Sequence, residues 1–238
     1  MRGIGPIVGR EWAAAFGRPL AVVVFALFVS TAALLSLWFD DFLTSGVASL
    51  RRPLAWFWVC LLFVAPALSM RTFAEEWRSG TWSVLGALPL SPLEVVLGKW
   101  LATWGLLGVA LALTLPWPVA LVIVGEPDIG PIVAGYLGLG LGAGALAAIG
   151  VAASAWTESV VLAFLGAFLL GLVPWLFGSA LAVVPTGLVP LVEALSFEPA
   201  LDAFARGVVD TRGVALFAAV TGAALRLAVH AVERRRWR

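Results

Sequence analysis

The sequence contains two places whose residues could bind a nucleotide phosphate, and neither is complete. Gly98 and Lys99 match the end of a phosphate-binding loop, but Trp100 stands where that loop needs Ser or Thr. Leu93 also replaces the first glycine of the loop. The glycine-rich run 135–150 contains no G-x-G-x-x-G pattern and follows no predicted strand. We therefore expect no ATP site in this chain.

Other residues that could do chemistry are isolated. Cys60 is the only cysteine, so we expect no intrachain disulfide and no cysteine-cluster metal site. His230 is the only histidine and lies near the end of an apolar run, where we expect a structural role. No Ser, His and Asp set converges on one face, so an intramembrane enzyme has little support. We expect no catalytic residue, bound cofactor or metal.

Composition indicates the class of protein that must position these residues. Apolar residues make up 62% of the chain and charged residues 12%, and the mean hydropathy is +1.03. A soluble domain could not bury so much apolar surface. We expect an all-α integral membrane protein with a single domain, 1–238, and six transmembrane helices near the ~20 apolar residues that a bilayer requires. The predicted spans are Leu20–Trp38, Leu54–Met70, Lys99–Val124, Ile132–Trp156, Val160–Val183 and Gly213–Val232.

Single residues within the spans predict how the helices pack and which class of transporter the protein could be. Pro116 should kink or end the third span early. In the fourth span Gly138 and Gly142, like Gly140 and Gly144, are four residues apart and present small faces for close packing. No Asp, Glu or Lys lies near the centre of a predicted span, which disfavours a proton- or ion-coupled transporter.

The basic residues predict the orientation of the chain. An even number of spans places both termini on one side, and the positive-inside rule selects the cytoplasm. The outer side then holds only Arg51, Arg52, Arg206 and Arg212. The cytoplasmic side holds Arg2, Arg10, Arg18, Arg71, Arg78, Lys99, Arg234, Arg235, Arg236 and Arg238. The net charge of +1 gives no reason to expect nucleic acid as a partner.

The cytoplasmic segment Arg71–Gly98 is too long for a plain connector. Thr72 and Glu75 have the spacing of a capping box and Gly80 is a helix stop, which predicts a short helix over Phe73–Ser79. This segment mixes acids with exposed apolar positions. Such a surface suits the docking of a soluble partner. The alternative is an amphipathic loop that lies on the membrane surface.

A second helix start follows in the same segment. Ser91 and Glu94 form another capping-box pattern, and Pro92 suits the first helical position. We expect this helix to continue directly into the third span. Between the two starts, Thr81–Ala87 has room for one more short helix.

The same stretch resembles a known family. The run FAEEWRSGTWSVLGALPLSPLEVVLGKWLA is similar to the cytoplasmic loop of ABC-2-type permeases, especially the gliding-motility-type branch. The C-terminal stretch LSFEPALDAFARGVVDTRGVALFAAV with the closing ERRRW, and the N-terminal GREWAAAFGRPLA, look like the same branch. The residues of the loop that carry the resemblance are Phe73, Glu75, Glu76, Gly80, Thr81, Leu88, Pro89, Val96, Leu97, Gly98 and Lys99.

The resemblance implies the membrane-spanning subunit of an ATP-driven exporter in a prokaryotic cell membrane. It implies an N-terminal interfacial elbow helix, a second permease copy as a homo- or heterodimer partner, and two separate ATPase subunits that bind ATP and Mg. It also implies a cytoplasmic coupling helix that contacts the ATPase. In that helix the charges of Glu75 and Glu76 would set the register of the contact with the ATPase. Its apolar anchors would be Phe73, Trp77 and Leu85. The complete expected coupling site is Phe73, Glu75, Glu76, Trp77, Arg78, Gly80, Thr81 and Leu85.

The outer segment before the last span has its own pattern. Pro199–Val209 predicts an amphipathic helix with Leu201, Phe204 and Val208 on one side. This helix could rest on the outer membrane interface. The family resemblance implies instead a re-entrant gate over the exit pathway.

Two functions of different classes remain open. The first is the exporter permease. The second is a membrane anchor or assembly component of a surface or motility machine that the same kind of ATPase powers without solute export. Both require an ATPase partner, and only the first predicts hydrolysis that a substrate stimulates. The substrate has no signature in the sequence.

Overall fold

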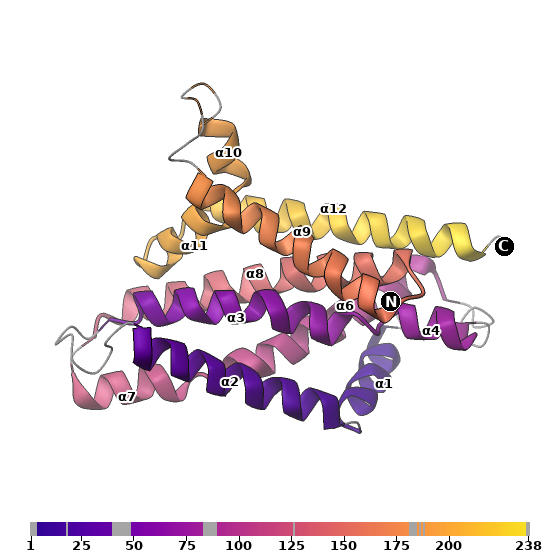
Figure 1. The fold of residues 1–238 in the computed structure, drawn as a ribbon, viewed down its shortest axis with the longest axis horizontal. Coiled ribbons are helices and arrows are strands. Elements are labelled where there is room, and N and C mark those ends of the chain that lie inside the picture. The colour runs from indigo at the N-terminus through magenta and orange to yellow at the C-terminus, as the bar shows by residue number, and fades with distance from the viewer. Residues whose placement is uncertain are drawn as a thin grey trace.

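The chain folds into helices, as Figure 1 shows for the computed structural model. The structure describes residues 4–17, 19–39, 49–82, 90–125, 127–180, 185, 187 and 189–236, and this part contains no strand. Six segments of it are helical, long and apolar enough to cross a membrane. The helices of these segments are α2 (Pro19–Phe39), α3 (Arg51–Ser69), α6 (Pro92–Ala112) with α7 (Pro116–Val124), α8 (Ile129–Trp156), α9 (Val160–Ala180) and α12 (Thr211–Arg236). The predicted all-α fold is confirmed, and so is the prediction of six helical segments that could span a membrane.

The shorter helices lie at the two ends of the long ones. They are α1 (Ile4–Phe16), α4 (Ala74–Ser79), α10 (Val189–Leu195) and α11 (Phe197–Ala205). Helices α1 and α4 and the C-terminus lie at one end of the molecule, and α7, α10 and α11 lie toward the other (Figure 1). We call the first the α4 end and the second the α11 end.

The third span is broken where proline predicts a break. Helix α6 ends at Ala112, and α7 begins at Pro116, which has no N–H to continue the hydrogen-bond ladder. At the other end of α6, Ser91 and Glu94 form the predicted capping box, with Pro92 in the first turn. The predicted helix start and the predicted break are both confirmed.

Helix α8 is the centre of the packing, because it contacts α3, α6, α9, α11 and α12. Its glycines make this possible. A Cβ at Gly142 would overlap the Trp58 ring of α3, and one at Gly138 would lie 2.7 Å from Phe204 of α11. The carbonyls of Gly140 and Gly144 accept hydrogen bonds of 2.9 Å from two indole N–H groups of α6. The predicted role of this run in close helix packing is confirmed.

The helix predicted over Pro199–Val209 forms with other bounds, as α11 over Phe197–Ala205. Helix α11 ends at Ala205, and Gly207 follows with φ +88°, so the chain turns before residue 208. Phe204 is fully buried and Leu201 is partly buried, as expected of one apolar side. Val208 is 57% exposed and lies beyond the helix. Its predicted place on the same side as Leu201 and Phe204 is therefore wrong.

Candidate functional site

The α4 end contains a buried lysine for which the sequence predicted no ion-pair partner. The Lys99 side chain is fully buried, and its ammonium lies 3.0 Å from Glu11 Oε1 and 2.9 Å from Glu76 Oε1. It also donates to the Thr72 carbonyl and lies 4.8 Å from the centre of the Phe73 ring. A buried ammonium requires such partners, because its desolvation is otherwise very costly.

A second cation completes the cluster. Arg10 Nη2 lies 2.9 Å from Glu11 Oε1 and 2.8 Å from Glu76 Oε1. We call Arg10, Glu11, Glu76 and Lys99 the Lys99 node. It contains two positive and two negative groups, so its charges balance. Because the four residues come from α1, α4 and α6, the node joins three helices that are separate in the sequence.

The acids of the node have different surroundings. Burial would raise the pKa of the Glu11 carboxyl, but the charge of Lys99 and the hydrogen bonds from Arg10 and Lys99 outweigh it, so its pKa is lowered below 4.5. The second oxygen of Glu76, Oε2, is buried with no hydrogen-bond partner in the described part of the chain. Each carboxylate therefore pairs with Lys99 and Arg10 through its Oε1 atom.

Helix α4 is capped from another helix. Ser154 of α8 accepts hydrogen bonds of 3.0 Å from the backbone N–H groups of Phe73 and Ala74, and its hydroxyl donates to the Met70 carbonyl at 3.0 Å. The sequence predicted that Thr72 would cap this helix. That prediction is wrong, because the Thr72 hydroxyl donates to the Ser69 carbonyl and the helix begins at Ala74.

The aromatic residues of the segment pack on one another. The ring centres of Phe73 and Trp77 are 5.8 Å apart, and those of Trp77 and Trp82 are 4.6 Å apart. Phe73 is fully buried. It therefore fixes α4 to the core, and the expectation that it offers a surface anchor to a partner is wrong. Leu85, the expected aliphatic anchor, lies outside the described residues.

The last helix also reaches α4. The guanidinium of Arg235 in α12 lies 4.8 Å from the centre of the Trp77 ring, and its Nη1 lies 2.8 Å from Glu158 Oε1 between α8 and α9. A cation over a tryptophan face is attracted by the ring quadrupole. Movement of α4 must therefore disturb contacts to α12 as well as to α1, α6 and α8.

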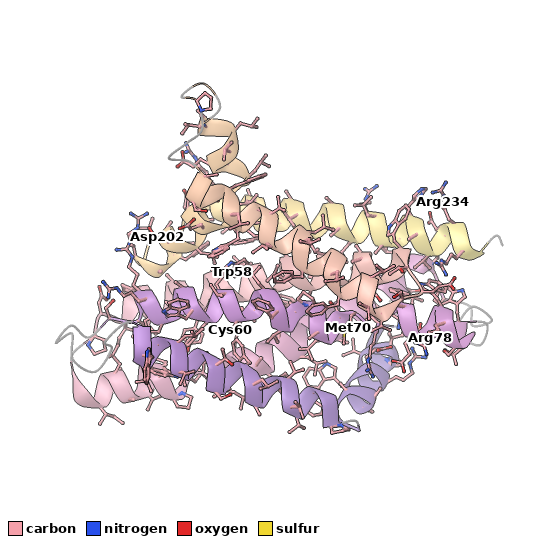
Figure 2. All side chains as sticks on the ribbon, viewed as in Figure 1. Trp58, Cys60, Met70, Arg78, Asp202 and Arg234 are labelled. Carbon is pink, nitrogen blue, oxygen red and sulfur yellow. The ribbon has the colours of Figure 1, made fainter. Side chains whose placement is uncertain are left out.

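The solvent-facing part of the segment is small and lies at the C-terminal end of α4. Gly80 has φ +72°, which a glycine adopts without strain, and it ends α4 as predicted. Arg78, Ser79, Gly80 and Thr81 are all exposed. Figure 2 shows Arg78 at the far end of the molecule from Asp202, on the side of Arg234. These four residues form the exposed tip of the segment, which we call the α4 tip.

A cavity lies beside the node. It has a volume of about 470 Å³ and is lined by residues of α1, α3, α4 and α6, among them Arg10, Glu11, Glu75 and Glu76. Glu75 is half-buried in this wall. Both acids that the sequence predicted at the coupling site, Glu75 and Glu76, therefore line this cavity. Sequence reasoning missed Arg10, Glu11, Ser154 and Arg235 as partners of α4, because none of them is a neighbour of this helix in the sequence.

The chain was compared with known proteins. It matches no protein-family model, and no curated protein is significantly similar to it. The contacts of α4 and of the Lys99 node are therefore the basis for a functional proposal.

Proposed function

We propose that this chain is the membrane-spanning subunit of an ATP-driven exporter and that a separate ATPase drives it through α4. One observation carries the proposal. The short helix between the second and third spans is fixed by charged, aromatic and hydrogen-bonding contacts to α1, α6, α8 and α12. A connector that only crossed the surface would not need these contacts.

The contacts give a route for force. An ATPase that closes on ATP would press on the α4 tip. Glu76 of α4 would pass this displacement to Lys99, which lies about two turns inside α6, and to Arg10 of α1. Ions held within 3 Å in a buried site resist separation, so α1, α4 and α6 would move together. In this proposal α1 is the elbow helix and α4 the coupling helix.

The partners follow from what the chain lacks. Because neither glycine-containing motif completes a phosphate loop, ATP and Mg would bind to the partner ATPase. A working unit would contain two permease chains and two ATPases, with the substrate moving outward between the permeases. Both termini and the α4 tip would face the cytoplasm of a prokaryotic cell.

The test uses the ATPase that we expect to be encoded beside this chain. The pair is co-expressed and purified from membranes, and hydrolysis is measured with and without candidate solutes. Arg78→Ala at the α4 tip should weaken retention of the ATPase, and Arg234→Ala in α12 is the matched control of equal charge. Equal retention by both variants and the parent would contradict a contact at the α4 tip. An assembled complex whose hydrolysis no solute changes would favour the surface-machine function instead.

A further inference from the structure

A second cavity lies at the α11 end, away from the Lys99 node. It has a volume of about 310 Å³ and lies between α3, α8, α9 and α11. Sites of this size bind small organic molecules. Figure 2 shows Asp202, one of its residues, at the opposite end from Arg78. Its wall contains Leu201, which the sequence placed at the outer gate.

The aromatic part of the wall consists of Trp56, Trp58 and Trp175. Trp58 is only 1% exposed, and its indole Nε1 has no hydrogen-bond partner in the described part of the chain. A buried indole N–H normally has an acceptor. A ligand oxygen would supply one.

The wall contains one cation, Arg51, and two carboxylates, those of Asp202 and Glu198. Arg51 Nη2 lies 2.7 Å from Asp202 Oδ1, so these two charges neutralise each other, and Arg206 outside the wall lies 3.4 Å from the other Asp202 oxygen. Glu198 has no ion pair among the described residues. Its carboxylate lies against α9 at Gly178, where any Cβ would overlap Oε2. The exposed Glu198 carboxylate therefore lines the same cavity as the three indole rings, and no described residue forms an ion pair with it.

We propose that this cavity binds an amphipathic organic cation. The ammonium would lie by the Glu198 carboxylate and the indole faces, whose ring quadrupoles attract cations. The apolar body of the ligand would fill the remaining aliphatic wall, and an oxygen of the ligand would accept from Trp58 Nε1. This inference deepens the proposed function by naming a substrate class, and only its link to transport rests on that function.

Binding is tested on the full chain alone, in maltoside micelles that contain no ammonium group. The probe is N-benzylcholine, and 3,3-dimethyl-4-phenylbutan-1-ol is its uncharged isostere with the same hydroxyl. Saturation-transfer NMR titrations should show that the cation binds at least tenfold more tightly than the isostere. Glu198→Gln should weaken the cation about tenfold and leave the isostere unchanged, and Trp175→Leu should weaken the cation about fivefold. Glu193→Gln, an exposed acid of α10 outside the cavity, is the matched control.

Two results would overturn the proposal. One is equal affinity for cation and isostere in the parent, and the other is an unchanged cation affinity in Glu198→Gln. The ammonium could come from a dissolved solute or from a lipid headgroup. An effect of Glu198→Gln on probe binding that is lost in phosphatidylcholine nanodiscs and kept in phosphatidylglycerol nanodiscs would identify the lipid, and an effect that is kept in both would identify the solute. Because this assay contains no ATPase, its failure leaves the coupling proposal standing. Failure of the ATPase to assemble would likewise leave the binding site standing.

Discussion

Loss of the buried ammonium is the sharpest perturbation of the α4 end. Lys99→Met keeps most of the side-chain volume but leaves the Glu11 and Glu76 carboxylates with Arg10 alone. Breaking a buried ion pair by removing one partner costs about 3–5 kcal/mol. Because the two carboxylate side chains retain 20% and 16% of their exposure, we expect about 3 kcal/mol, the lower end of that range.

The assay is the free energy of unfolding in micelles, measured by steric trapping. Arg234→Met, which removes an exposed cation from α12, is the control and should change it by less than about 0.5 kcal/mol. Glu76→Gln combined with Lys99→Met should cost less than the sum of the single changes by about 0.5–3 kcal/mol, because the two groups contact each other. If Lys99→Met resembles the control, or if the single effects add, the node does not hold α4.

Three further predictions concern α4, its orientation and its pH dependence. Ser154→Ala leaves two buried N–H donors unpaired, so hydrogen exchange in α4 should accelerate in line with a loss of about 1–3 kcal/mol, and unchanged exchange would exclude the cap. Single cysteines at Ser45 and Thr186 should react with impermeant maleimide in intact cells and one at Ser79 should not; labelling of Ser79 would reverse the topology. Because the pKa of Glu11 is lowered on folding, the unfolded state binds more protons, and stability should fall as pH drops from 4.5 through the folded pKa. The same pH titration of Glu11→Gln should be flatter, and equal slopes would contradict the assigned contacts.

The fold could be predicted because its strongest signals are local. Apolar runs of bilayer length, the Ser91 capping box, the stop at Gly80 and the break at Pro116 each depend on neighbouring residues. The glycines of α8 were also predictable as a packing face, since small residues four apart share one side of a helix. Which side chains would fill that face was not predictable. Trp58 and Phe204 come from elements far apart in the chain.

The candidate site was only partly predictable because its partners are distant in sequence. Glu76 was expected to face an ATPase, yet it pairs with Lys99 in the next span. The α4 cap comes from Ser154, about 80 residues later in the chain. A tertiary contact therefore takes the place of the local capping-box pattern at Thr72. Phe73 was expected to be an apolar anchor for the ATPase, but its ring lies 4.8 Å from the buried ammonium. Local sequence patterns predict that a helix forms, but they do not predict which other helices it contacts.

The most direct test of the coupling proposal is site-specific photocrosslinking in the assembled, ATP-hydrolysing complex. A photoreactive amino acid is placed at Ser79 in the α4 tip, and at Ser45 in the predicted outer connection as the control. The proposal predicts that the ATPase is captured from Ser79 and not from Ser45, and that the yield from Ser79 changes when ATP is added. An active complex in which Ser79 captures no ATPase would contradict it.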